Sequence, residues 1–166
     1  MTFSNRICRT LEEEHAATVQ LMERLSQLLA RHPRSSPPRG DDRAVGQFLA
    51  QLASAIETDL ARHFSFEERA LFPYLDANGE AEIGAHLTDE HAVIRPLGER
   101  LVALSRGAGA GFDEAGWSEF RKVGGDLCGR LSGHAQKEDS ALLPLLEDTM
   151  DAETEAKLYD EYVGNE

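Results

Sequence analysis

The chain contains an internal repeat, and the repeated unit is a pair of helix-forming segments. Residues 14–25 read EHAATVQLMERL and residues 90–101 read EHAVIRPLGERL, so both begin with Glu-His-Ala and end with Glu-Arg-Leu. Residues 63–75 read HFSFEERALFPYL and residues 134–146 read HAQKEDSALLPLL, with His, Glu, Ala, Leu, Pro and Leu at matching places. Two copies of one helical hairpin fold most simply into a four-helix bundle.

Apolar side chains recur every three or four residues through four long stretches, as expected for helices that bury one face. No stretch alternates apolar and polar residues as a half-buried strand does. The prolines of residues 32–42, HPRSSPPRGDD, separate the first two stretches, because proline lacks the amide hydrogen that a helix needs. We predict helices over about residues 5–31, 43–75, 80–106 and 113–146, and a short helix over about 152–162.

The later connections between these helices are short, so neighbouring helices should run antiparallel. The predicted fold class is therefore all-α, an up-down-up-down four-helix bundle with a short C-terminal helix. A chain of 166 residues, of which 41% are apolar, can build one buried core without disulfides. We expect a single domain over residues 1–166, with the bundle at about 5–148.

Charge and hydropathy exclude several classes of partner. The chain has 30 acidic and 17 basic residues, a net charge of −13, which repels phosphate groups, so we expect no binding to nucleic acid or to membranes. No apolar run approaches the ~18 residues of a membrane-spanning helix, and the N-terminal stretch lacks the apolar core of a secretory signal. The sequence thus predicts a soluble, cytoplasmic protein in which Cys8 and Cys128 stay reduced.

Each copy of the hairpin carries one histidine on its first helix and an H-x-x-x-E pair on its second. Residues four apart lie one above the other on a helix, so each pair presents an imidazole and a carboxylate in the same direction. These residues also fall within the apolar seams, where an unpartnered carboxylate is costly to bury and a metal cation compensates most directly. The candidate metal ligands are His15, His63, Glu67, His91, His134 and Glu138.

A single histidine in such a seam is more often a hydrogen-bonded core residue than a ligand. Six residues of ligand type, repeated in register across both hairpins, favour a metal site. Imidazole suits zinc, copper, iron and nickel, and two added carboxylates favour a higher coordination number, so the set fits two bridged iron ions, with zinc as the main competitor. Ferritin-like di-iron bundles instead space Glu and His three apart and use more carboxylates.

This order of residues resembles the hemerythrin-like, HHE cation-binding family, and the resemblance spans about Leu11 to Leu146. The family pattern is a histidine on the first helix, H-x-x-x-E on the second, a histidine on the third, and H-x-x-x-E or H-x-x-x-D on the fourth. The resemblance implies that the six candidate residues are the ligands. It also implies that Glu67 and Glu138 bridge two irons, together with an oxygen species.

One departure from the family concerns the third helix. Oxygen-carrying hemerythrins, which this chain resembles, place two histidines four apart there, whereas His86 and His91 are five apart. Five residues correspond to ~140° around an ideal helix, so we predict that His86 is not a ligand and lies near the bundle surface. A π-bulge between the two histidines would overturn this prediction. Glu90 is no better candidate for an additional metal ligand, because it lies ~100° from His91 around the helix.

The ligand count limits the function. If both irons are six-coordinate, the ligands and one bridging oxygen species leave two positions open for a small molecule. We expect a protein that binds or senses dioxygen, nitric oxide or iron. The alternatives are a redox enzyme acting on peroxide or nitric oxide, an iron donor for the repair of iron-sulfur clusters, or a protein in which the metal only stabilises the fold. We expect the small residues Ala16, Ala92 and Ala135 to leave room for access.

Overall fold

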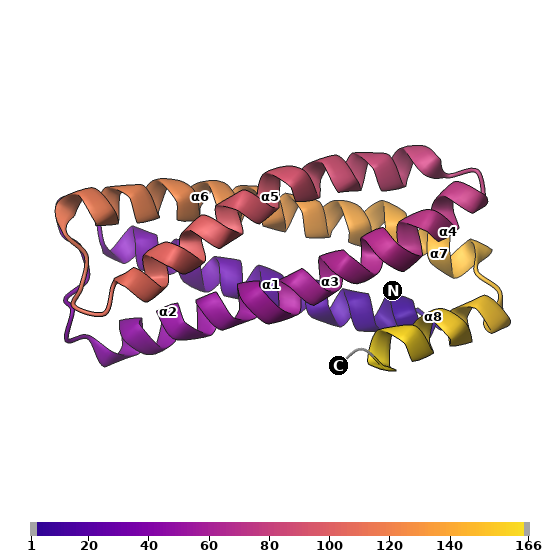
Figure 1. The fold of residues 1–166 in the computed structure, drawn as a ribbon, viewed down its shortest axis with the longest axis horizontal. Coiled ribbons are helices and arrows are strands. Elements are labelled where there is room, and N and C mark those ends of the chain that lie inside the picture. Colours follow the sequence, from indigo (N-terminus) through magenta and orange to yellow (C-terminus); the bar gives the residue numbers. More distant parts are fainter. Residues whose placement is uncertain (1–2, 165–166) are drawn as a thin grey trace.

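A computed structural model describes residues 3–164, which form four long antiparallel helices and a short fifth helix (Figure 1). The second and fourth long helices are continuous but include wider π-helical turns, labelled η. The elements are α1 (Arg6–Arg31), α2 (Arg43–Ala55), η1 (Ile56–Leu60), α3 (Ala61–Phe66), η2 (Glu67–Leu71), α4 (Phe72–Ala77), α5 (Ala81–Gly107), α6 (Glu114–Lys137), η3 (Glu138–Leu142), α7 (Leu143–Thr149) and α8 (Ala152–Gly164). The predicted all-α bundle is confirmed, and the predicted helix ends lie within a few residues of these bounds.

Short polar side chains start three of the helices. The Asn5 carboxamide accepts hydrogen bonds from the first amides of α1, and Asp42 does the same for α2. Asp113 accepts from the Gly116 amide at the start of α6. Each cap satisfies amides that have no partner inside the helix. The turn before α5 contains Gly79 at φ 85°, a conformation that favours glycine.

Two of the three π-helical turns begin at predicted ligands, whereas η1 contains none. The turns η2 and η3 begin at Glu67 and Glu138, and each is followed by a proline, Pro73 or Pro144. A proline ring clashes with the carbonyl four residues earlier in a regular α-helix, and a wider turn relieves that clash. The bulge considered for the third helix does not occur, because α5 is a continuous α-helix from Ala81 to Gly107.

The core consists of two apolar clusters with a polar layer between them. The cluster toward the 32–42 linker includes Met22, Leu101, Trp117 and Phe120, and the other includes Leu11, Leu71, Leu87 and Leu142. Cys128 lies in the first cluster and Cys8 in the second, and both are buried, free thiols. All six candidate ligands are buried and lie between these clusters along their helices.

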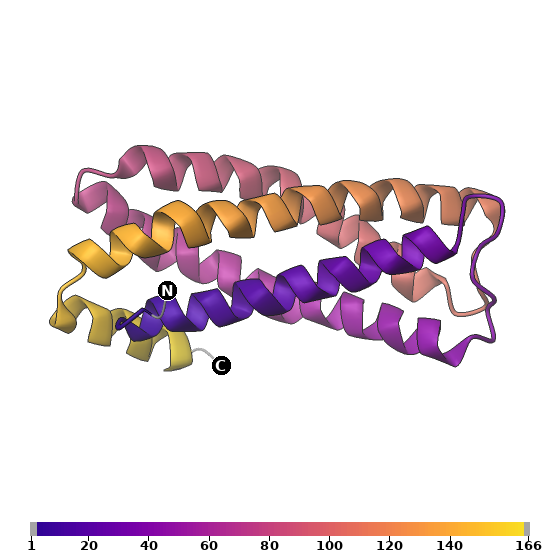
Figure 2. The same ribbon diagram turned by 180° about the vertical axis from the view of Figure 1, so that it is seen from behind.

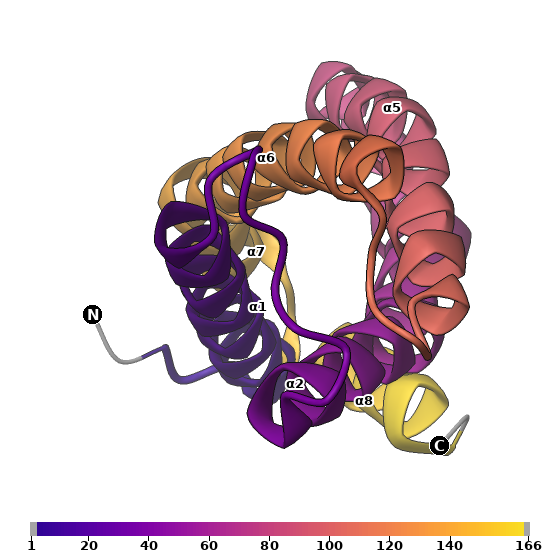
Figure 3. The ribbon, with the colours of Figure 1, turned by 90° about the vertical axis from the view of Figure 1, so that its left-hand side faces the viewer.

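Neighbouring helices do not approach one another equally. The bundle is seen end-on in Figure 3: α6 packs along both α1 and α5, whereas α1 and α2 approach each other less closely. The short helix α8 folds back against the N-terminal half of α1, as seen from behind in Figure 2. No helix among the described residues is long and apolar enough to cross a membrane.

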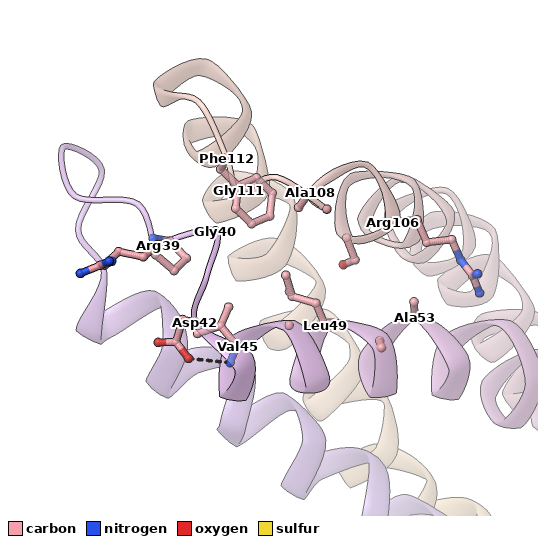
Figure 4. Close-up of a pocket in the computed structure, with 15 residues that line it drawn as sticks. Arg39, Gly40, Asp42, Val45, Leu49, Ala53, Arg106, Ala108, Gly111 and Phe112 are labelled. Carbon is pink, nitrogen blue, oxygen red and sulfur yellow. Dashed lines mark hydrogen bonds between the residues drawn. The ribbon is translucent and has the colours of Figure 1, made fainter.

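The linker after α1 meets the loop after α5 at the end of the bundle farthest from α8. A side chain at Gly40 would collide with the carbonyl of Ala110, so this close approach requires glycine. Beneath the two loops lies a cavity of about 240 Å³ between α2 and the end of α5, lined in part by Val45, Leu49 and Phe112 (Figure 4). No candidate ligand lines this cavity.

Candidate metal centre

The structure brings the six candidate ligands together in the middle of the bundle. They form two groups that share the glutamates, and within each group one ligand atom per residue lies within 4.8 Å of the others. One group adds His15 and His63 to Glu67 and Glu138, and the other adds His91 and His134 to the same glutamates. One hairpin supplies both histidines of the first group, and the other hairpin supplies both of the second.

Each shared glutamate faces at least one histidine from each group, and Glu138 also lies 3.8 Å from His63 Nε2. The carboxylate of Glu67 lies 3.1 Å from His63 Nε2 and 3.3 Å from His91 Nε2. The carboxylate of Glu138 lies 2.7 Å from His15 Nε2 and 2.8 Å from His134 Nε2. Two adjacent positions, each with two imidazoles and two shared carboxylates, therefore lie side by side.

An outer ring of carboxylates holds the other nitrogen of each histidine. The distances between Nδ1 and the nearest carboxylate oxygen are 2.5–2.7 Å. Each partner comes from a neighbouring helix, so the contacts run once around the bundle. The pairs are His15 with Asp139, His63 with Glu14, His91 with Glu68, and His134 with Glu90.

The outer ring was not predicted from the sequence, although the sequence contains a signal for it. Glu14 and Glu90 immediately precede His15 and His91, and Glu68 and Asp139 immediately follow the two shared glutamates. Each acidic residue is thus the chain neighbour of a ligand candidate, but it contacts a histidine on a different helix. Glu90 was dismissed because it points away from His91, and this direction is what brings it to His134.

The outer ring fixes the direction of the hydrogen bonds. A neutral imidazole that donates from Nδ1 to a carboxylate keeps a lone pair on Nε2. The four Nε2 atoms then face the glutamates and one another, with 3.2 Å between His15 and His63 and 3.0 Å between His91 and His134. Among residues 3–164, no donor is aligned on any of the four oxygens of Glu67 and Glu138. A buried centre made only of acceptors requires cations.

Without metal, protons supply part of that positive charge. Burial lowers the pKa of His15, but the hydrogen bond to Asp139 and the nearby negative charge of Glu138 outweigh burial and raise this pKa to about 9. For His63, burial is likewise outweighed by Glu67, Glu138 and Glu14, so its pKa lies well above the ordinary value. Burial raises the pKa of Glu138, yet its contacts with three histidines lower it well below the usual range. The centre therefore attracts cations strongly.

His86 lies outside the centre, as predicted. Its side chain is 62% exposed, and its Nε2 lies 3.3 Å from Glu90 and 3.5 Å from the Lys137 ammonium. The expected access beside three alanines is wrong for two of them, because Ala16 and Ala92 are exposed on the outer faces of their helices. Helix rotation explains this, since the residue after an inward-facing histidine points ~100° away.

Apolar side chains enclose the centre, and two grooves reach it, of which one, about 320 Å³ in volume, lies between α5 and α6 and is lined in part by Glu90 and His134. Phe64 stacks on His91, with ring centroids 3.7 Å apart. The other groove, of about 260 Å³, runs along the loosely packed seam between α1 and the α2–η1 segment and ends at His63. Its walls include Ala17 and Leu60, and the buried Leu131 of α6 forms part of its floor.

Fold and centre together define a helical-bundle protein with a buried cation site. The family model described as hemerythrin HHE cation binding domain matches residues 6–146, so the chain belongs to the hemerythrin-like, HHE cation-binding family. Metal binding follows from this membership and from the buried His/Glu groups. No match is found among curated proteins.

Proposed function

We propose that the protein holds two iron ions on His15, His63, Glu67, His91, His134 and Glu138 and presents them to dioxygen or nitric oxide. The observation that carries this proposal is the acceptor-only centre, in which four Nε2 atoms and two carboxylates converge without a donor. Two ions, rather than one, fit the two groups of four residues that share Glu67 and Glu138. Glu67 and Glu138 would then be shared by both ions.

Iron fits this donor set better than the competing metals. Structural zinc favours four ligands in a closed tetrahedron, while shared carboxylates and imidazoles suit a metal of higher coordination number. When bound, iron supplies redox chemistry and open positions for a small molecule. Zinc remains a substitute that the same side chains can hold.

The residues around the candidate ligands orient the histidines and shield the centre from water. The outer carboxylates keep each Nε2 lone pair directed at the centre, so little reorganisation is needed when a metal arrives. Binding of metal displaces the protons that His15 and His63 carry in the metal-free protein. The apolar clusters exclude water above and below the polar layer. The groove that ends at His63 gives a small apolar molecule a way in.

Binding or sensing ranks ahead of catalysis. The titratable residues in contact with the six ligands are the outer carboxylates, and each of these is already engaged with a histidine. Among the described residues that line the groove ending at His63, the remaining carboxylate is that of Asp59, which is exposed and lies at the outer part of the groove, away from the centre. The groove is nevertheless open to solvent, which favours the redox-enzyme alternative because external reductants can approach.

Metal analysis combined with optical spectroscopy tests the proposal. The protein is purified without oxygen, its metal content is measured, and its spectrum is recorded before and after exposure to air. We expect two irons per chain and a spectrum that changes on exposure to air. One metal per chain, or two zinc ions in protein from cells supplied with iron, would contradict the proposal.

A further inference from the structure

The two hairpins are equivalent in sequence, but their outer carboxylates are held differently. Glu14 and Glu90 occupy matching places in the repeat. One carboxylate oxygen of each contacts a histidine in the same way: an oxygen of Glu14 lies 2.7 Å from His63 Nδ1, and an oxygen of Glu90 lies 2.7 Å from His134 Nδ1. The difference between the hairpins lies in what holds the second oxygen.

The second oxygen of Glu14 is held beneath α8. The hydroxyl of Tyr162 donates to this oxygen, and Arg62 Nη2 lies 3.0 Å from it. Tyr162 is only 2% exposed, and its ring packs on Phe66 with centroids 4.6 Å apart. The Arg62 guanidinium lies over the same ring, 5.2 Å from its centroid. Glu14 therefore has little freedom to turn away from His63.

The second oxygen of Glu90 has only surface partners. Its contacts are the Lys137 ammonium and the His86 imidazole, whose side chains are 52% and 62% exposed. No helix of the described chain covers this pair as α8 covers Glu14. Exposed ion pairs restrain their side chains weakly, because water and salt compete for both groups. Glu90 is thus less firmly fixed than Glu14.

The helix that makes this difference lies outside the family match. The matched region ends at residue 146, and α8 spans Ala152–Gly164. The chain therefore adds, beyond the family domain, a buried tyrosine that contacts the outer ring of the metal centre.

We propose that Tyr162 is a positioning residue that acts through Glu14 on His63 and makes the two metal positions unequal. This inference rests on the proposed function. At the position held by His15 and His63, the His63 side is the firmly built one, and this position retains its metal longer. The position held by His91 and His134 exchanges its metal first, because Glu90 and its surface partners rearrange easily. Loss of an outer partner of a metal-binding histidine weakens metal binding by about 10–100-fold.

The variant Tyr162→Phe tests this, because it keeps the ring on Phe66 and removes only the hydroxyl. Tyr159→Phe is the matched control: it makes the same change on α8, where the Tyr159 ring lies against Arg6 instead. Iron release to a chelator is followed for both variants and for the wild type, with Mössbauer spectra of ⁵⁷Fe-loaded samples. Melting of the metal-free proteins reports any general loss of packing.

We expect two phases of iron release from the wild type, and in Tyr162→Phe a slow phase that is about tenfold faster. One of the two Mössbauer signals should shift, while Tyr159→Phe matches the wild type in both measurements. Unchanged release and spectra in Tyr162→Phe would overturn the inference. Equal changes at both irons, or the same changes in Tyr159→Phe, would also overturn it. Failure of the proposed function is recognised separately, since wild-type protein would then lack two irons before any variant is compared.

Discussion

The ring of Phe64 lies nearly parallel to the imidazole of His91, with 3.7 Å between centroids and 11° between the planes. Phe64 is buried, and it also contacts His134 edge-on at 5.4 Å between centroids. One aromatic side chain thus separates two histidines of the centre from the apolar cluster toward the linker. This contact leads to the first prediction.

Replacing Phe64 with alanine should destabilise the protein and admit water beside His91. Truncation of a buried phenylalanine costs about 3–5 kcal/mol in free energy of unfolding, because contacts are lost and a cavity remains. Denaturant unfolding measures the loss. Val93→Ala is the control, since Val93 is 45% exposed and its truncation should change stability by less than about 0.5 kcal/mol. Similar losses in both variants would contradict the assigned role of Phe64.

The second prediction separates the candidate ligands from His86. His91→Ala should remove one of the two imidazoles at its position and lower the metal content to one ion per chain or less. His86→Ala should keep the metal content of the wild type, because His86 faces solvent and makes its polar contacts with Glu90 and Lys137 rather than with a ligand candidate. Metal analysis after purification under identical conditions gives the comparison. Loss of metal in His86→Ala would place that residue in the centre and refute our assignment.

The third prediction concerns the stability of the metal-free protein as the pH changes. The folded-state pKa of His15, about 9, exceeds the ordinary 6.5, so its contribution to stability is complete below pH 6.5 and is lost as the pH rises through 9. The loss is at most about 1.4 kcal/mol per pH unit for this group. Glu138 has a lowered pKa, so its contribution is present above pH 4.5 and is lost below.

Denaturant unfolding of the metal-free protein between pH 4 and pH 9.5 measures this dependence. Maximal stability should lie near pH 5–6.5, where His15 and His63 are protonated and Glu138 is ionised. The metal-loaded protein should lack the decline on the alkaline side, because metal ions then take the place of the protons. A metal-free protein that is equally stable at pH 6 and pH 9 would show that the histidines carry no such protons.

The fourth prediction is that metal removal lowers the melting temperature. A ligand bound only by the folded state stabilises it by about 4 kcal/mol when its free concentration is a thousand times its dissociation constant. Removal also leaves the carboxylates of Glu67 and Glu138 without aligned donors. Scanning calorimetry before and after dialysis against a chelator measures the change. An unchanged melting temperature would mean that the metal contributes nothing to the fold.

The fifth prediction concerns the reaction with oxygen. If two six-coordinate irons are bound and leave two positions open, these positions and the groove open to solvent would favour two-electron reduction over reversible storage. We expect air to oxidise the reduced protein quickly and nitric oxide to bind the reduced form. Stopped-flow spectroscopy follows the mixing of reduced protein with oxygen. A spectral change that persists for minutes and reverses under vacuum would identify an oxygen carrier instead.

Much of this protein could be predicted from local sequence pattern. The repeat and the spacing of apolar residues predict four helices, because helix formation and burial of one face depend on residues three and four apart. The same periodicity places His63 with Glu67 and His134 with Glu138 on the inner faces. It also predicts that His86, five residues from His91, points outward.

Other features depend on contacts between helices that are distant in the chain. The outer ring joins each histidine to a carboxylate on a neighbouring helix, and the relative rotation of two helices, which packing sets, decides which acidic side chain arrives. The position of the groove that ends at His63 follows from how loosely α1 and α2 pack.

The sequence by itself therefore determined the helices, the repeat and the inward-facing candidate ligands, since all of these follow from spacing along one helix. Only the tertiary structure decided how the two halves differ. Glu14 and Glu90 look alike in the repeat, yet Tyr162 holds the first and exposed side chains hold the second. That difference arises because α8 folds back on α1. Burial of the Tyr162 ring against Phe66 stabilises this arrangement, and the two residues are 96 positions apart in the sequence.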